Sequence, residues 1–126
     1  MEIYLVRHTS VNVPAGYAYG QTDVPLRPTF EKEAEAVKKT LSGHTFDKVW
    51  SSPLTRCTRL AAYCGYPDAE KEDRIKEISF GEWEGLCCRR ENYQIPSKDF
   101  EQFFTDPFGY KPCLLYTSPS PRDKRQ

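Results

Sequence analysis

The first half of the chain alternates between two spacings of hydrophobic residues. Residues 3–6 read IYLV, and such an unbroken, partly β-branched run is typical of a strand buried on both faces of a parallel sheet. From Thr29 to Leu41 the apolar residues recur every three or four positions with charged residues between them, and Gly43 follows. This spacing predicts an amphipathic helix that ends before the glycine.

A second strand and a second helix follow this pair. The stretch DKVWSS, residues 47–52, predicts a short strand. The stretch from Ser51 to Cys64 predicts a helix with Ser52 as its N-cap and Pro53 in the first helical position. The order strand, helix, strand, helix predicts an α/β fold in which a mostly parallel sheet is flanked by helices.

The remaining segments predict loops and a domain boundary. Residues 13–28 are rich in glycine and proline, which predicts a long irregular loop of the kind that is usually functional, with Asp23 capping or tying it. Residues 86–112 are aromatic and mixed, with a helical excursion. We therefore expect one domain over residues 1–112. Residues 113–126, rich in Ser, Pro and basic residues, are expected to be a non-native or disordered tail.

Charge and composition narrow the class of protein. The chain of 126 residues carries 18 basic and 18 acidic side chains, so no overall field attracts nucleic acid or an anionic membrane. It contains no apolar run long enough to span a membrane and no signal-peptide pattern at its start, which predicts a cytoplasmic protein. The five cysteines lack metal-ligand spacing, and we expect free thiols and no bound metal.

Three short stretches carry residues that suit phosphate chemistry. LVRHTS places Arg7 and His8 at the end of a predicted strand, where parallel sheets bind ligands. SSPLTR places Arg56 in the first turn of a predicted helix, either as a solvated surface residue or as part of an anion site with the helix N-terminus. In IKEISFGEWEG, residues 75–85, apolar neighbours could desolvate one carboxyl group and raise its pKa, as a general acid requires. The carboxylates there are Glu77, Glu82 and Glu84.

Taken in this order, the motifs LVRHT, YGQTDVPL, SSPLTR and IKEISFGEWEG resemble the histidine phosphatase superfamily, also called the phosphoglycerate mutase-like family. The resemblance covers residues 2–86, whereas residues 87–112 match only in general character. It implies a three-layer α/β fold and a reaction without a cofactor. In that reaction a histidine attacks phosphorus, and water later hydrolyses the phosphohistidine.

The same resemblance implies a role for individual residues. His8 matches the nucleophile, Arg7 and Arg56 match the two phosphate clamps, and Glu77 matches the proton donor, with Ile75 where the family usually has leucine. Elementary chemistry agrees with these roles. A histidine of ordinary pKa is mostly neutral at pH 7 and needs no separate base. Arginines neutralise the phosphate oxygens, and an alkoxide leaving group requires a proton.

The likeness narrows further to the alpha-ribazole phosphatase branch, because Thr9 follows the histidine in place of the usual glycine and the YGQTDVPL loop is present. It implies hydrolysis of alpha-ribazole 5'-phosphate in cobalamin biosynthesis, with Gln21 and Thr22 as candidate contacts to phosphate or ribose. A phosphoglycerate mutase, a broad sugar-phosphate phosphatase and an inactive phosphate-binding fragment stay open as alternatives. In each case the expected partner is a small-molecule phosphate ester, and the oligomeric state is undecided.

One expected element of the family is missing from the sequence. The family has a second active-site histidine in a late GH-containing motif, whereas this chain contains only His8 and His44, and His44 matches no motif. We therefore expect the chain to be the N-terminal part of a histidine phosphatase domain, incomplete at its C-terminus. Because loss of one preorganised donor costs about a hundredfold or more in rate, this polypeptide is expected to be poorly active.

Overall fold

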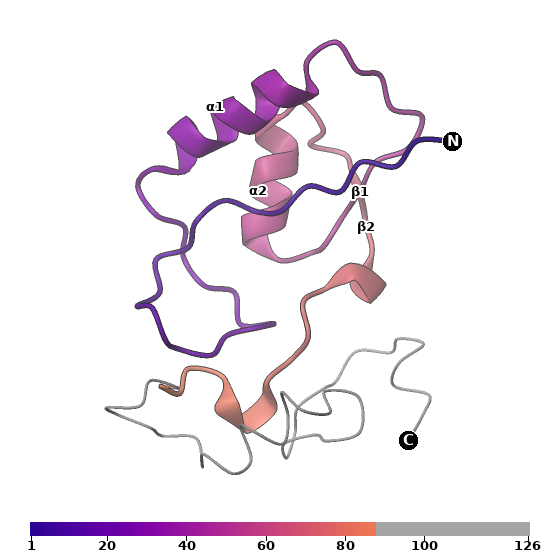
Figure 1. Ribbon diagram of the computed structural model, residues 1–126. Helices are drawn as coiled ribbons and strands as arrows, with labels where there is room; N and C mark the ends of the chain where they lie inside the picture. Colours follow the sequence, from indigo (N-terminus) through magenta and orange to yellow (C-terminus); the bar gives the residue numbers. More distant parts are fainter. Residues whose placement is uncertain (88–126) are drawn as a thin grey trace. The chain divides into compact units, whose positions relative to one another are not determined.

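A computed structural model describes residues 1–87 of the chain (Figure 1). The predicted aromatic segment beyond residue 87, the domain boundary after residue 112 and the predicted tail lie outside the described residues. The elements in order are α1 (Phe30–Leu41), β1 (Trp50–Ser51), α2 (Thr55–Tyr63), β2 (Glu70–Lys71) and two 3₁₀ turns, η1 (Asp73–Ile75) and η2 (Gly81–Trp83). No helix within this part of the chain has the length and apolarity needed to cross a membrane.

The described residues belong to two units, each of which has its own internal contacts. Among the described residues, the first unit comprises residues 1–12 and 23–75, and the second comprises residues 13–22 and 76–87. In the first unit, β1 and β2 pair in parallel, with Trp50 opposite Glu70, and α2 connects them. A parallel strand pair joined by a helix confirms the α/β prediction, although β1 is shorter than the predicted strand over 47–52.

The core of the first unit lies between α1 and α2, which pack against each other (Figure 1). Phe30 and Ala34 of α1 and Leu60 of α2 are buried there, with partly buried side chains around them. The predicted helix is confirmed, since α1 ends at Leu41 and Gly43 adopts a left-handed backbone with φ of +83°. Acidic residues in the first turn of α1 and basic residues in the last turn also suit the helix dipole.

The prediction of a buried strand at residues 3–6 is wrong for the described structure. The segment is extended without strand pairing, and the side chains of Ile3 and Leu5 are 73% and 94% exposed. An apolar run indicates that a segment favours burial. A strand, however, forms only where another strand supplies backbone hydrogen bonds. Within residues 1–87 the sheet consists of β1 and β2 alone, and neither pairs with this segment.

The predicted start of the second helix is also wrong. Ser52 was expected as the N-cap, yet α2 begins at Thr55 with Leu54 in the N-cap position. The Ser52 hydroxyl instead accepts a hydrogen bond from the Leu54 N–H at 3.3 Å, which closes a short turn ahead of the helix. The Thr55 N–H donates to Asp23, 32 positions earlier. Because this cap comes from a distant loop, local sequence could not reveal it.

The second unit is built from two chain segments linked by backbone hydrogen bonds. The Ala18 N–H donates to the Leu86 carbonyl at 2.9 Å, and the Gly85 N–H donates to the Ala18 carbonyl at 2.8 Å. Tyr17 and Cys87 form an isolated antiparallel bridge next to this pair. The loop of residues 13–22 is therefore held to the segment that follows η2, and Trp83 of η2 is buried.

Candidate functional site

Arg7 and His8 lie in the extended segment near the start of the chain. Arg7 is exposed and His8 is half-buried. The His8 Nδ1 atom lies 2.7 Å from the carbonyl oxygen of Thr9. Because a carbonyl oxygen only accepts hydrogen bonds, Nδ1 carries the proton, and in the neutral ring the lone pair is then on Nε2. The imidazole is thus held in the tautomer that presents Nε2 as a nucleophile.

Thr9, the residue that distinguishes this chain from the usual motif of the resembled family, is buried with 5% of its surface exposed. Its carbonyl oxygen orients His8, as described above. Its hydroxyl makes no hydrogen bond within the described residues. Burying a hydroxyl without a hydrogen bond costs free energy. Threonine at this position therefore carries a cost that glycine would not.

Arg56 is the second residue of α2, and it is the largest side chain that is fully buried in the described structure, with 1% exposed. The interpretation of Arg56 as a solvated surface residue is therefore wrong. A buried cation in the first turn of a helix is opposed both by desolvation and by the positive end of the helix dipole, and an anion at that position relieves both. Arg59, one turn further along α2, is exposed, with its guanidinium 4.6 Å from the Phe30 ring centre.

Asp23 joins the loop to the start of α2. Its carboxylate accepts hydrogen bonds from the Thr55 N–H at 2.9 Å and from the Thr55 hydroxyl at 2.5 Å. The expectation that Asp23 caps or ties the loop is confirmed. This contact also places a carboxylate at the N-terminus of α2, on Thr55, the residue that precedes Arg56.

Gln21 and Thr22 share one carboxylate partner, which the sequence did not identify. The Glu84 side chain accepts hydrogen bonds from the backbone N–H groups of Gly20, Gln21 and Thr22 at 2.6, 2.8 and 3.0 Å. The side chain of Gln21 is half-buried, and Thr22 is exposed. Glu84 was one of three similar carboxylates in its stretch, and no local spacing set it apart from Glu82.

Glu77 is exposed, and its carboxylate accepts a hydrogen bond from the N–H of the next residue, Ile78, at 3.0 Å. The expected desolvation by apolar neighbours is not present in the described structure. Ile75 is itself 53% exposed, and Trp83 is buried. Apolar residues near a carboxylate in sequence cover it only if the backbone turns them toward it, and the two turns around Glu77 do not.

The six residues predicted to form the site are distributed over both units. Arg7, His8 and Arg56 belong to the first unit, whereas residues 21, 22 and 77 belong to the second. Within the first unit, Ser10 also connects the His8 segment to α1. Its N–H and its hydroxyl both donate to the Glu33 carboxylate, at 3.1 and 2.8 Å.

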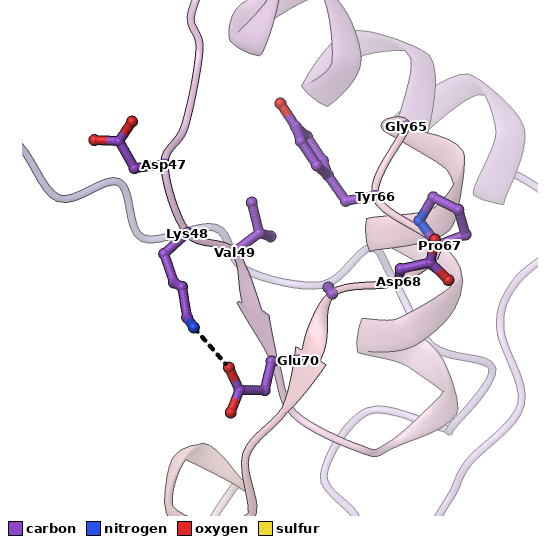
Figure 2. A pocket seen from close by; sticks show the side chains of 9 residues that line it. Asp47, Lys48, Val49, Gly65, Tyr66, Pro67, Asp68 and Glu70 are labelled. Atoms are coloured by element: carbon purple, nitrogen blue, oxygen red, sulfur yellow. Dashed lines mark ion pairs between the residues drawn. The ribbon is translucent and has the colours of Figure 1, made fainter.

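A cavity of about 340 Å³ lies elsewhere in the first unit (Figure 2). It is lined by residues 47–49, which precede β1, and by residues 65–70, which lead from α2 into β2. Lys48 and Glu70 form an ion pair of 3.4 Å at its edge (Figure 2). None of the predicted site residues lines it. It lies at the amino ends of the parallel strands, opposite the edge where such sheets bind ligands.

The described side chains do not assemble a metal site. Among residues 1–87 no group of three or more His, Cys, Asp and Glu side chains is arranged to hold a metal ion.

Comparisons with known proteins point to one family. A family model described as the histidine phosphatase superfamily (branch 1) matches residues 3–122. Phosphoserine phosphatase 1 of Hydrogenobacter thermophilus is 32% identical over 111 residues, which cover 85% of this chain and 52% of that protein. The chain spans about half the length of the curated relatives it matches.

Solved structures agree with this result. The crystal structure of TTHB049 from Thermus thermophilus matches with a TM-score of 0.69 and 25% identity, over 87% of this chain and 58% of that one. The phosphoserine phosphatase from Entamoeba histolytica, solved in complex with 3-phosphoglyceric acid, matches with a TM-score of 0.57 and 32% identity. That match covers 76% of this chain and 48% of the other.

Proposed function

Because the chain belongs to the histidine phosphatase superfamily (branch 1), we propose that its function is to hydrolyse a phosphate monoester through a phosphohistidine intermediate. The observation that carries the proposal is the hydrogen bond between His8 Nδ1 and the Thr9 carbonyl, since it leaves Nε2 as the nucleophilic nitrogen. The activity is proposed for the whole protein, because this chain spans about half the length of its curated relatives.

The proposed reaction has two steps. The Nε2 lone pair of His8 attacks phosphorus while the bond from phosphorus to the ester oxygen breaks. Arg7 and Arg56 stabilise the phosphoryl oxygens, and Glu77 donates a proton to the departing alkoxide. Water then attacks the phosphohistidine and gives a proton to the Glu77 carboxylate while the bond between nitrogen and phosphorus breaks. Inorganic phosphate leaves, and His8 and Glu77 are restored. The exposed carboxyl group of Glu77 is accessible to a leaving group and to solvent for reprotonation.

The proposed substrate is alpha-ribazole 5'-phosphate. Support comes from the likeness of Thr9 and of residues 19–26 to the alpha-ribazole phosphatase branch. Gln21 and Thr22 are the proposed contacts to phosphate or ribose, and their backbone is held in place by Glu84. Phosphoserine is a second candidate, because two relatives carry the name phosphoserine phosphatase.

Acid-labile labelling tests the nucleophile. Incubating the chain, completed with a C-terminal region that restores the second histidine, with a phosphate ester labelled in the phosphoryl group should give protein-bound label that is lost in acid and survives in base. The label should be absent from a His8→Ala variant and present in His44→Ala, because His44 is exposed and bonded to Tyr4. Label that persists in His8→Ala would contradict the proposal.

The substrate is tested by phosphate release from alpha-ribazole 5'-phosphate, phosphoserine and 3-phosphoglycerate, each with the same labelling control. The highest kcat/KM with the ribazole ester is the expected result. Transfer of label to a second hydroxyl of phosphoglycerate, without release of phosphate, would indicate a mutase instead. Binding of phosphate without label or turnover would indicate a phosphate-binding protein.

A further inference from the structure

The Glu84 carboxylate binds three consecutive backbone amides in the second unit. Its Oε2 atom accepts from the Gly20 N–H at 2.6 Å, and its Oε1 atom accepts from the N–H groups of Gln21 and Thr22 at 2.8 and 3.0 Å. Both oxygens of one side chain are thus used to hold one stretch of loop. Hydrogen bonds from amides to an ionised carboxylate are about twice as strong as those between neutral groups.

These amides require an acceptor at this position. Gly20 is buried, so water cannot readily replace a lost partner of its N–H, and a buried unpaired donor is costly. Successive N–H groups that converge on one point form a concave site for an anion. A carboxylate with two acceptor oxygens satisfies this arrangement, whereas a neutral amide side chain offers one oxygen and turns a donor toward the remaining N–H.

Position 20 has no room for a side chain. A Cβ atom at position 20 would overlap the Ile78 carbonyl oxygen and lie 3.2 Å from the Phe80 ring. The loop backbone is therefore packed directly on the residues that follow Glu77. Glu84 holds the loop against this surface, and the backbone bonds between Ala18 and Gly85 anchor it at its base.

We propose that Glu84 is a positioning residue for the phosphatase reaction. It fixes the backbone of residues 20–22 so that the side chains of Gln21 and Thr22 meet the substrate in one geometry. This inference rests on the proposed function, because it assigns Gln21 and Thr22 to the substrate site. Glu84 itself is occupied by the three amides and takes no part in proton transfer.

The test compares Glu84→Gln with Glu84→Asp and with Glu82→Gln in the full chain. Glu84→Gln keeps the shape and removes the charge and one acceptor oxygen. Glu84→Asp keeps both oxygens on a shorter stem. Glu82→Gln is the matched control, because it makes the same change on an exposed side chain in the same turn.

Two readouts are measured on each variant. The first is amide hydrogen exchange at residues 20–22, which needs no activity. Glu84→Gln should accelerate this exchange, and Glu82→Gln should leave it unchanged. The second is steady-state kinetics. Glu84→Gln should raise KM, with a loss in kcat/KM of up to about 100-fold from misplaced contacts. For Glu84→Asp, both the exchange rate at residues 20–22 and kcat/KM should lie between the values for Glu84→Gln and those for the unmodified chain.

The outcomes separate this inference from the proposed function. Unchanged exchange in Glu84→Gln overturns the positioning role whatever the activity. Faster exchange with an unchanged KM and a lower maximal rate also overturns it, since that result describes a smaller folded fraction. If the chain completed at its C-terminus releases phosphate from none of the esters and takes up no label, the proposed function is refuted. The exchange data still report whether Glu84 holds the backbone of residues 20–22.

Discussion

At the scale of single residues, the described structure is organised by carboxylates that bind backbone amides and hydroxyls more than by ion pairs. Glu33 illustrates this, because it accepts from the Ser10 N–H and hydroxyl and from the Thr29 hydroxyl. These bonds, the Ser10 hydroxyl first, lower the pKa of Glu33 below its ordinary value of 4.5. Since Ser10 lies two positions after His8, Glu33 anchors the segment that contains His8 to α1.

The lowered pKa of Glu33 predicts a pH dependence of stability. A carboxyl group whose pKa is lower in the folded state stabilises the fold above its unfolded pKa, and this contribution is lost as the pH falls through the folded pKa. The chain should therefore be more stable than a Glu33→Gln variant near neutral pH, and the difference should shrink below the ordinary pKa of 4.5. Urea unfolding across this range measures it.

Glu31→Gln is the control for this measurement, because Glu31 is an exposed carboxylate in the same first turn of α1. The free energy of unfolding of Glu31→Gln should differ less from that of the unmodified chain than the value for Glu33→Gln does. A Glu33→Gln variant whose deficit grows with acidification would contradict the prediction, since it would require a raised pKa for Glu33.

At the scale of elements, α2 depends on a cap from outside its own sequence neighbourhood. Asp23 takes the place that Ser52 was expected to fill, with two hydrogen bonds to Thr55. A carboxylate at this position also interacts favourably with the positive end of the helix dipole. The helix that carries Arg56 is therefore held at its first turn by a residue of the long loop.

Removing this cap should destabilise the helix. Asp23→Ala is expected to lower the free energy of unfolding by about 0.5–2 kcal/mol, the range measured for N-cap replacements. Asp23→Asn should lose less, because its side-chain oxygen still accepts one bond. Thermal and urea unfolding followed by far-UV circular dichroism measure both. Asp47→Ala, which replaces an exposed aspartate before β1, is the control, and an equal effect of the two alanine variants would contradict the capping role.

At the scale of the whole molecule, burial is uneven along the chain. Leu60 in the α1–α2 core is 4% exposed, whereas Leu5 in the extended segment is 94% exposed. Leu5 belongs to the run that predicted a buried strand, whereas Leu60 belongs to the helix predicted over residues 51–64. A helix buries its apolar face as soon as a second helix packs on it, but the extended segment makes no strand pairing among residues 1–87.

Two matched leucine variants test this difference in the 126-residue chain. Leu60→Ala is expected to lower the free energy of unfolding by about 2–5 kcal/mol, because it removes buried methyl groups and leaves a cavity. Leu5→Ala should change it by less than about 0.5 kcal/mol, as for other exposed sites. Urea unfolding measures both. A cost for Leu5→Ala as large as that for Leu60→Ala would mean that residues 3–6 are covered.

The parts of this protein that the sequence determined are those encoded by near neighbours. The spacing of Phe30 and Ala34 was sufficient for α1, and four short motifs were sufficient for the family. The order of strand and helix patterns was sufficient for the α/β class, but the strand that pairs with β1, β2, was not predicted. Helical periodicity and motif identity are local properties, because each depends on side chains only a few positions apart.

Tertiary structure alone decided which distant groups meet. The Asp23 cap on Thr55 spans 32 positions, and the bond from Gln21 to Glu84 spans 63. Tertiary structure also left residues 3–6 exposed, against the prediction of a buried strand, and it buried Arg56, which the sequence had left open between a solvated residue and an anion site. The physical reason is the same in every case. Each of these groups is stabilised by a partner that the folded backbone brings close to it. The residues adjacent in sequence do not predict which partner that will be.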